Sequence, residues 1–560
     1  MAFFQKKYKS IKRWSVVAEI IVKNGLGFII ERLQLGYHYL GKKQKHRIKE
    51  EVPLNKVNLA ERIRKTFEEL GPTFIKLGQM LSTRPDIIPI TLCAEFKKLQ
   101  DKVKPLPFSE IEVVLKEAYG DNYREKFESI DEIALASASL AQVHRAKLKG
   151  SLEEVVLKIQ KPGLETVIEG DIQIMRDFAT LMKKYELGVE FLDPEQLIEE
   201  FKKNIYEEIN FILEARNTER IGENFKESEY IIIPEVFWEY SHRKVMVTRF
   251  IQGEKLNAVN FEDRSEFKKE EIVSRGTDAF LKMIFEDGFF HGDPHPGNIL
   301  ITGEGKVALI DFGIIGRLDR QTKNILVDVF IGVIYHDIER IIYSIEDLGL
   351  IEEGTEVREL RYEVASLLDK YYGISLGDLL LKDVIDDAFE KIEKYSIRIP
   401  PNLYILIKTL MTVEGIGKEI YPEYNIFAST RYYAKKMIQE RYSPGNVFSE
   451  GVREFWKFKR FLMNLPDDLN SIIKKTKRGQ LKIEFEHKGL KNLITALDHL
   501  SNRVAFSLII SALIVSSSLI INFNVGPKLF GISVIGLIGY IIAGVLGLFL
   551  IIVILRSGKY

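Results

Sequence analysis

The sequence has almost no cysteine, no net charge and no clean apolar run near its start. Cys93 is the only cysteine among 560 residues, so no disulfide can form within the chain, which fits a reducing compartment. Lysine plus arginine number 80, as do aspartate plus glutamate, and this balance gives no support for a nucleic-acid partner. With 46% hydrophobic and 29% charged residues, most of the chain is expected to fold, into about two to four domains.

The apolar stretch in residues 1–35 is interrupted by Lys12, Arg13 and Glu19. It therefore predicts neither a transmembrane helix nor a signal peptide. It predicts an amphipathic helix, which would lie at a membrane interface or pack on the folded domain. Basic residues outnumber acidic ones in residues 1–50 and 451–503, a pattern that suits an anionic membrane surface; solvated helix faces explain the first segment equally well.

The chain is organised around His291-Gly-Asp-Pro-His-Pro-Gly-Asn298, followed by Asp311-Phe-Gly. An Asp, an Asn five positions later and then Asp-Phe-Gly is the spacing of the phosphoryl-transfer loop of protein kinases. Asp293 would be the acceptor-side carboxylate. Asn298 and Asp311 would supply oxygen ligands to Mg²⁺, which prefers hard oxygen donors and leaves room for phosphate.

Two apolar runs, residues 299–301 and 306–310, separate these motifs and flank Gly303-Glu-Gly305. They predict a β-hairpin. Because paired strands share their ends, the hairpin would bring Asn298 and Asp311 together.

Residues 133–159 predict a phosphate-covering hairpin and the strand that follows it. Small residues let backbone N–H groups approach phosphate oxygens, where ordinary kinases use glycines. Lys158 lies on an apolar strand and is predicted to pair with the α/β-phosphates, although alone it would equally fit a surface lysine with a buried stem. The small residues are Ala136, Ser137, Ala138 and Ser139.

Residues 193–225 predict one long helix that Asp193-Pro194 opens. Glu208 and Glu214 flank its apolar stripe, and one of them should pair with Lys158, because the kinase mechanism requires a Lys–Glu ion pair. For either glutamate the plainer interpretation is a solvated helix carboxylate. The stripe consists of Leu197, Phe201, Ile205, Ile209 and Ile212.

Residues 57–130 predict helices, among which the segment 71–86 stands out. Lys76 and Gln79 lie three residues apart, so they would point together from one helix face. Gly78 between them would permit close approach of another backbone. Taken alone, such a patch is more often solvated than functional.

Residues 230–253 predict two strands and a hinge, in which backbone groups from Thr248 to Ile251 would contact adenine. Residues 268–290 predict an amphipathic helix leading into the catalytic loop. Beyond residue 313 the chain is predicted to be helical to about residue 500.

Two uncharged runs, residues 504–521 and 529–555, are each long enough to span a bilayer. The short link between them contains Gly526-Pro527, so they predict a helical hairpin; the alternative is a buried soluble hairpin. Basic residues at both ends place the body of the protein in the cytoplasm by the positive-inside rule, against which Lys528 in the link is a small counter-signal. These basic residues are Lys488, Lys491, Arg503, Arg556 and Lys559.

Together, these motifs resemble the UbiB family of atypical protein-kinase-like ATPases, which is tied to ubiquinone-type isoprenoid-quinone biosynthesis. Lys76-Leu-Gly-Gln79 matches the family's Lys-x-Gly-Gln signature, and residues 136–139 match its Ala-rich loop. Glu208-Ile-Asn210 falls on the Glu-x-Asp motif, but Asn210 stands where the family has Asp, so contact with the Lys-x-Gly-Gln helix would be weaker. The remaining matches are Lys158 as the nucleotide lysine, Glu214 as its partner, Asp293 as the catalytic aspartate, and Asn298 and Asp311 as metal ligands.

The resemblance implies an α+β, protein-kinase-like bilobal fold with a helical N-terminal extension, a helical C-terminal region and a two-helix transmembrane hairpin. It implies ATP or ADP and Mg²⁺ as ligands, and membrane lipids, quinone-precursor lipids and quinone-biosynthesis proteins as partners. ATP hydrolysis would be coupled to the lipid-like precursors, because Lys76, Gln79, Glu208 and Asn210 would occlude the pocket for a protein substrate. The expected domains are an extension (1–130), an N-lobe (131–253), a C-lobe (254–430), a basic juxtamembrane region (431–502) and the hairpin (503–556).

Two other functions fit parts of the sequence. A small-molecule kinase of the aminoglycoside or choline type shares His-Gly-Asp-x-His-x-x-Asn, but the Lys-x-Gly-Gln segment and the membrane hairpin argue against it. A nucleotide-binding, non-catalytic scaffold is the other, and the complete set of transfer residues argues against that.

Overall fold

The computed structural model divides the chain into two compact units, residues 1–447 and 448–560. It describes residues 2–28, 56–82, 84, 87–99, 103–151, 153–184, 193–261, 268–351, 357–371, 380–394, 400–441, 455–456, 459, 463, 490–523, 526–529 and 532–556. Most of the predicted juxtamembrane region, residues 431–502, lies outside these residues.

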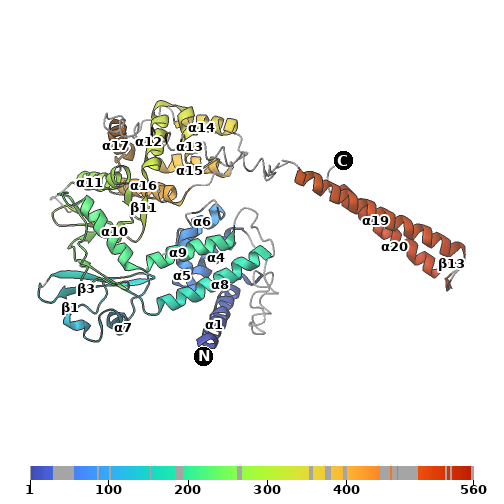
Figure 1. Ribbon diagram of the computed structural model, residues 1–560, viewed down its shortest axis with the longest axis horizontal. Helices are drawn as coiled ribbons and strands as arrows, with labels where there is room; N and C mark the ends of the chain where they lie inside the picture. Colours follow the sequence, from blue (N-terminus) through green and yellow to red (C-terminus); the bar gives the residue numbers. More distant parts are fainter. Residues whose placement is uncertain are drawn as a thin grey trace. The chain divides into compact units, whose positions relative to one another are not determined.

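A five-stranded antiparallel sheet forms one layer of the larger unit (Figure 1). The strands run in the order β1-β3-β4-β6, and β2 pairs with β3. The prediction of helices over residues 57–130 is wrong at β1, because Phe127 is buried and pairs with Leu148 on β3. The strands are β1 (Phe127–Ile130), β2 (Ala136–Ser137), β3 (Ala141–Leu148), β4 (Glu154–Gln160) and β6 (Val245–Arg249).

The alternation of side chains along β4 decides which face carries the lysine. Leu157 and Ile159 are fully buried in a cluster shared with helix α7 (Phe108–Tyr119). Val156 and Lys158 point to the opposite, half-buried face, as a period of two residues requires.

Short strands and many helices make up the second lobe. One sheet has the order β5-β10-β9-β7, and β8 pairs with β11. The strands are β5 (Ile231–Ile232), β7 (Glu254–Lys255), β8 (Phe289–His291), β9 (Ile299–Ile301), β10 (Val307–Leu309) and β11 (Ile315–Arg317). The helices are α11 (Lys269–Leu281), α12 (Arg320–Tyr335), α13 (Ile338–Asp347), α14 (Val357–Tyr371), α15 (Leu381–Lys394), α16 (Pro401–Ile420) and α17 (Ile426–Arg441). Single turns occur at η2 (Tyr123–Glu125), η3 (Leu256–Ala258) and η5 (Pro296–Asn298), and a π-helical segment at η4 (Lys282–Asp287).

The predicted hairpin between the two motifs is confirmed. Strand β9 pairs antiparallel with β10, with Ile299 opposite Leu309. The Ile310 N–H donates to the Asn298 carbonyl at 2.9 Å, so the pairing continues up to the residue before Asp311. Asn298 and Asp311 therefore emerge at the same end of the hairpin.

The two strands predicted in residues 230–253 are confirmed, and they belong to different sheets, because β5 pairs with β10 while β6 pairs with β4. The prediction for the neighbouring segment needs correction. The helix expected over residues 268–290 is α-helical only to Leu281, continues as η4 and ends at Gly288, which has φ +61°. Phe289 and Phe290 then enter β8, where both are buried.

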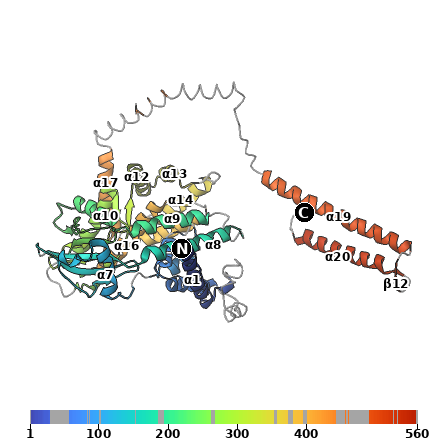
Figure 2. The same ribbon diagram turned by 60° about the horizontal axis from the view of Figure 1, so that its bottom comes forward.

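A helical layer beside the first sheet shares one hydrophobic core (Figures 1 and 2). Its first helix packs on the folded domain: Arg13 donates to Asp171 at 2.7 Å, Trp14 donates to Asp177 at 3.1 Å, and Val17 is fully buried. The sequence predicted that this helix lies at a membrane interface or packs on the folded domain, and in the structure it packs on the domain. The layer consists of α1 (Ala2–Lys23), α4 (Lys56–Leu70), α5 (Pro72–Leu81), α6 (Ile90–Phe96), α8 (Leu164–Lys184) and α9 (Pro194–Glu208).

The single helix predicted for residues 193–225 is wrong, because it is two helices, α9 and α10 (Phe211–Asn224). The Phe211 N–H donates to the Arg243 carbonyl at 3.1 Å, and the Ile209 carbonyl accepts from Gln160 at 3.0 Å. These tertiary contacts take backbone groups that a continuous helix would use. Asp193 caps α9 as predicted, since its carboxylate accepts from the Glu195 N–H.

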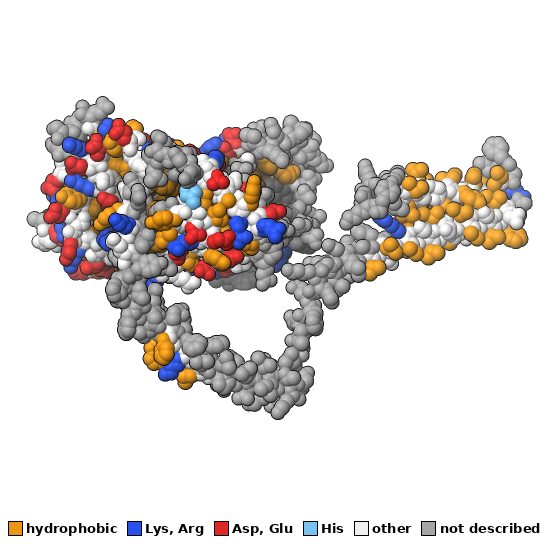
Figure 3. Space-filling view, turned by 90° about the horizontal axis from the view of Figure 1, so that it is seen from above, with side chains coloured by type: hydrophobic (Ala, Val, Ile, Leu, Met, Phe, Trp, Pro, Cys, Tyr) orange, Lys and Arg blue, Asp and Glu red, His pale blue; other side chains and the backbone are white. Residues whose placement is uncertain are grey.

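The smaller unit is a helical hairpin of α19 (Leu490–Asn522) and α20 (Val534–Arg556). Residues 500–522 and 534–551 are long and apolar enough to cross a membrane, and few of their side chains are buried within the protein. Figure 3 shows the hydrophobic surface that this leaves. The second helix begins at Val534 rather than Leu529, because β12 (Lys528–Leu529) and β13 (Ile532–Ser533) pair at the tip (Figure 2).

Candidate active site

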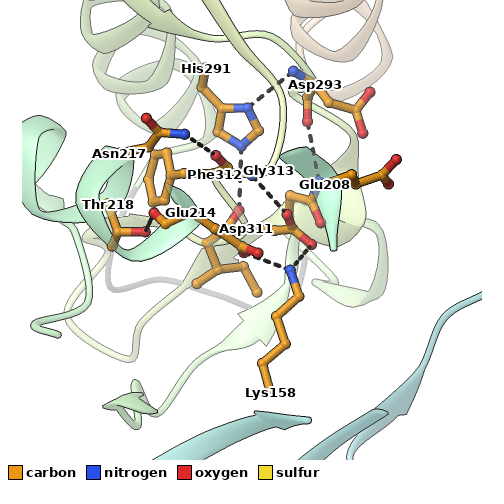
Figure 4. A network of polar contacts seen from close by, with 12 residues as sticks. Lys158, Glu208, Glu214, Asn217, Thr218, His291, Asp293, Asp311, Phe312 and Gly313 are labelled. Atoms are coloured by element: carbon orange, nitrogen blue, oxygen red, sulfur yellow. Dashed lines mark hydrogen bonds and ion pairs between the residues drawn. The ribbon is translucent and has the colours of Figure 1, made fainter. Parts of the chain in front are cut away.

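Lys158 joins three elements at the centre of the site (Figure 4). Its ammonium, on β4, donates to Glu214 on α10 at 2.6 Å and to Asp311, just after β10, at 3.1 Å. Glu214 is 4% exposed and Asp311 45% exposed, so the pair with Glu214 is the structural one and Asp311 faces outward. Of the two glutamates predicted as partners, the structure selects Glu214.

Burial and these contacts shift the pKa values of the three charged groups in different directions. Burial alone would lower the pKa of Lys158, but the carboxylates of Asp311 and Glu214 raise it above its usual value. Burial raises the pKa of Glu214 to about 7, against the pull of Lys158. For Asp311, partial removal from water would raise the pKa, but the Lys158 ammonium and the Gly313 N–H outweigh it and hold the pKa at about 2. Asp311 is therefore a carboxylate anion, the form that a metal ion requires.

The backbone at Asp311 has φ +65°, a left-handed conformation that is uncommon outside glycine. The Gly313 N–H donates to Asp311 Oδ1 at 3.2 Å and so supports this turn. Strained conformations of this kind concentrate at functional sites.

His291 holds the catalytic loop from within the core (Figure 4). The Asp293 N–H donates to His291 Nδ1 at 3.1 Å, and His291 Nε2 lies 3.3 Å from the Ile310 carbonyl oxygen. Since Nδ1 accepts, the proton belongs on Nε2, where it points to that carbonyl. Burial lowers the pKa of His291, so the ring is neutral. Sequence reasoning included His291 in the motif but gave it no role.

Asn298 closes the same loop. Its amide donates to the Asp293 carbonyl at 3.2 Å, so both sides of the Asp293 backbone are fixed. Asn298 and Asp311 lie at one end of the β9–β10 hairpin, and their amide and carboxylate oxygens are the kind of donor that suits a Mg²⁺ ion which keeps positions for phosphate. Within the described residues, no cluster of three His, Cys, Asp or Glu side chains could hold a metal by itself.

Lys408, on α16, donates to Asp293 Oδ1 at 2.9 Å. Sequence reasoning missed this residue. It lies 115 positions from Asp293, inside a stretch that carried no recognisable motif, so no local pattern could have found it.

Phosphate binding by the small residues at 136–139 stays a prediction, and the structure shows which of their donors are already engaged. The Ala138 N–H is already bonded to the Ala141 carbonyl at 2.9 Å. The hydroxyl groups of Ser137 and Ser139 are buried and have no partner among the described residues. Hydroxyl donors would meet phosphate oxygens here and relieve the cost of that burial. Ala136 pairs with Val143 on β3.

A second lysine pair lies beside the first. Lys76 on α5 contacts Glu208 on α9 at 2.5 Å, and Gln79 donates to the Leu99 carbonyl at 3.3 Å. Gly78 is packed against side chains, those of Leu99 and Phe67, rather than against the predicted backbone.

Asn210 begins α10, yet its side chain makes no capping bond, and its Oδ1 is buried with no partner among the described residues. The structure therefore brings Lys76 to Glu208 and not to this oxygen. Thr248 lies on β6 opposite Val156, and Ile251 follows that strand; their contact with adenine stays a prediction.

This fold and site define a protein of the atypical kinase-like class. The model of the ABC1 atypical kinase-like domain matches residues 98–345, that of the UbiB helical domain residues 364–425, and that of the ABC1/UbiB kinase-like C-terminal domain residues 488–556. The chain belongs to the UbiB family, which confirms the resemblance and the fold class inferred from the sequence.

Relatives match over most of their length. An "Uncharacterized protein in hydrogenase 1 5'region" of Clostridium pasteurianum is 33% identical, with 98% of this chain and 99% of that protein covered. A "Probable protein kinase UbiB" of Aeromonas salmonicida is 31% identical, with 84% and 87% covered. Among solved structures, the complex of Rv3197 with erythromycin from Mycobacterium tuberculosis aligns with a TM-score of 0.44 at 22% identity, covering 63% of this chain and 89% of that one.

Proposed function

We propose that this protein is a membrane-anchored atypical kinase or ATPase that binds ATP with Mg²⁺ and supports ubiquinone-type isoprenoid-quinone biosynthesis. The observation that carries the proposal is the contact of Lys158 with both Glu214 and Asp311. A lysine held between a helix glutamate and the Asp-Phe-Gly aspartate is the arrangement that kinases use to align a nucleotide.

Each residue has a role that follows from its surroundings. Ser137 and Ser139 would donate to phosphate oxygens, Lys158 would pair with the α/β-phosphates, and Asn298 and Asp311 would hold Mg²⁺, which neutralises charge on the phosphates. Asp293 would accept the proton of the attacking water. As the water oxygen bonds to the γ-phosphorus, the bond from that phosphorus to the bridging oxygen breaks, and ADP leaves with the electron pair.

The membrane part of the proposal rests on the helical hairpin and on the charges beside it. The two candidate spans are joined by a short tip, so both ends of the hairpin would lie on one side of a bilayer. Arg503 and Arg556 flank the spans, which supports a cytoplasmic kinase-like body by the positive-inside rule. Membrane lipids and quinone-precursor lipids are then the proposed partners.

The site is also partly closed to large substrates in this proposal. The Lys76–Glu208 pair ties α5 to α9, next to the helix that carries Glu214. The family resemblance assigns this segment an occluding role, which favours ATP hydrolysis coupled to lipid-like precursors over phosphorylation of other proteins.

The test is ATP hydrolysis by the purified full-length protein, with and without anionic liposomes and a phenol that mimics a quinone headgroup. Asp311→Asn is the blank, because it removes a metal ligand and keeps the shape of the side chain. Turnover that rises with liposomes and phenol and vanishes in the variant supports the proposal. Tight Mg²⁺–ATP binding without turnover would instead indicate a nucleotide-regulated scaffold, or a kinase whose acceptor is absent from the assay. Phosphorylation of a soluble alcohol would favour the small-molecule kinase.

A further inference from the structure

The catalytic loop carries no lysine or arginine of its own beside Asp293. Between Asp293 and Asn298 the sequence is Pro-His-Pro-Gly, without lysine or arginine. Lys158 is engaged by Glu214 and Asp311, and Lys76 by Glu208. Lysine and arginine side chains commonly orient groups in phosphoryl transfer, so a lysine or arginine that orients Asp293 would come from elsewhere in the fold.

Lys408 places a positive charge beside Asp293. Its ammonium donates to Asp293 Oδ1 at 2.9 Å, and the two side chains are 39% and 36% exposed. The backbone of Asp293 is fixed by His291 and Asn298, but those contacts leave the carboxylate free to rotate about its side-chain bonds. Lys408 holds Oδ1, so Oδ2 is the oxygen presented to an attacking group.

Helix α16 is packed closely enough to hold this lysine in place. Ile405, on the same helix, lies so near Gly292 that a Cβ there would be 2.8 Å from the Ile405 side chain. Gly292 immediately precedes Asp293, and only glycine permits this approach. Leu403 and Leu406 of α16 are buried in the core of the second lobe.

We propose that Lys408 is a positioning residue for the proposed catalytic aspartate, and that α16 thereby completes the kinase-like site from outside the ABC1 domain. The ABC1 match ends at residue 345, whereas Lys408 falls within the UbiB helical match, residues 364–425. The inference rests on the proposed function, since orienting Asp293 matters only if Asp293 takes the proton of the attacking group. The helical domain would then be part of the catalytic machinery.

The first experiment compares ATP hydrolysis by full-length wild type, Lys408→Ala and Lys408→Arg. Lys408→Ala is expected to lower kcat about 10- to 100-fold, the usual effect of a misplaced catalytic group, with KM for ATP changed less than about 2-fold. Lys408→Arg keeps a cation that can reach the carboxylate and should recover most of the loss. Lys418→Ala, on the same helix, is the matched control and should behave as wild type.

A double variant separates positioning from a general structural role. Asp293→Asn, Lys408→Ala is expected to be no slower than Asp293→Asn alone, because Lys408 acts through the carboxylate that is already lost. Additive losses in the double variant, or a Lys408→Ala effect on KM alone, would overturn the proposal.

Chemical labelling of lysines tests the Lys408–Asp293 contact without a measurement of ATP turnover. Reductive methylation of the full-length protein, followed by mass spectrometry, reports how accessible each lysine amine is. Lys408 should be labelled several-fold faster in Asp293→Asn than in wild type, with Lys418 unchanged. If wild type neither hydrolyses nor binds Mg²⁺–ATP, the proposed function fails, and this labelling still decides whether Lys408 holds Asp293. Equal labelling rates at Lys408 would mean that it does not.

Discussion

Two lysine–glutamate pairs lie on either side of the break between α9 and α10, and they differ in depth. Lys158 pairs with Glu214, which is 4% exposed, whereas Lys76 pairs with Glu208, which is 28% exposed. The two lysines are buried to a similar degree, 17% exposed for Lys158 and 14% for Lys76, so the difference lies in the glutamates. Glu214 cannot turn to water when its partner is lost, whereas Glu208 can do so in part, so the second pair opens at lower cost. The first pair is thus suited to fixing a nucleotide lysine, and the second to holding a segment that can move away.

The substitution expected to have the largest effect is Lys158→Ala, because it leaves Glu214 buried without its partner. Unfolding by denaturant should show a loss of about 3 kcal/mol near pH 8, together with loss of Mg²⁺–ATP binding. Burial raises the pKa of Glu214 to about 7, from 4.5 in the unfolded chain. The contribution that protonation of Glu214 makes to the free energy of unfolding is therefore fully present below pH 4.5 and is lost as the pH rises through about 7. The deficit of the variant should therefore shrink on acidification. A deficit that grows toward low pH would contradict this account.

Gly78→Ala tests how firmly the second pair is carried by its helix. A Cβ at Gly78 would collide with the Leu99 side chain and crowd Phe67 at 3.1 Å, so a loss of about 1–3 kcal/mol is expected from thermal unfolding. Gly170→Ala, on α8, is the control. Nothing lies within 4 Å of its Cβ position, and the exchange should stabilise by about 0.5–1 kcal/mol. Equal effects of the two substitutions would mean that α5 is free to shift.

Lys76→Ala should change the free energy of unfolding less than Lys158→Ala or Gly78→Ala does. The pair with Glu208 is partly exposed, so its loss is expected to change the free energy of unfolding by less than about 1 kcal/mol. The affinity for Mg²⁺–ATP, measured by equilibrium binding, should stay within about 3-fold of wild type. A loss of binding as complete as that of Lys158→Ala would remove the distinction between the two pairs.

Asn210→Asp is the mildest change, and it restores the family's carboxylate at the break. A negative charge at the start of α10 gains from the helix dipole, while Glu208 and the burial of the Oδ1 position oppose it. Because residue 210 as a whole is only partly buried, the carboxylate can turn toward water, so the melting temperature should move by no more than about 2 °C. Nucleotide affinity should change less than about 2-fold. A larger change would show that this position acts on the site.

Short-range patterns predicted much of the site. The Gly303-Glu-Gly305 turn between apolar runs was enough to predict the β9–β10 pairing and thus the shared end of Asn298 and Asp311. The alternation on β4 gave the direction of Lys158. Helical periodicity did not predict the break at Ile209–Asn210, because the apolar stripe continues across it. The break is held by two hydrogen bonds, one from the Phe211 N–H to the Arg243 carbonyl and one from the Gln160 side chain to the Ile209 carbonyl. No pattern pointed to Lys408, since its partner is remote in the chain.

By itself, the sequence determined the chemistry that is available: which carboxylates, amides and lysines occur at kinase spacing, and which runs are apolar enough to span a membrane. Residue type, period and turn chemistry act over a few positions, so the chain alone expresses them. The pair of Lys158 with Glu214 was one of two that the sequence allowed, but only the tertiary structure decided that Lys76 meets Glu208 and that Asp293 meets Lys408. Such choices depend on which helix faces meet when the cores close, and that is a property of packing between distant segments.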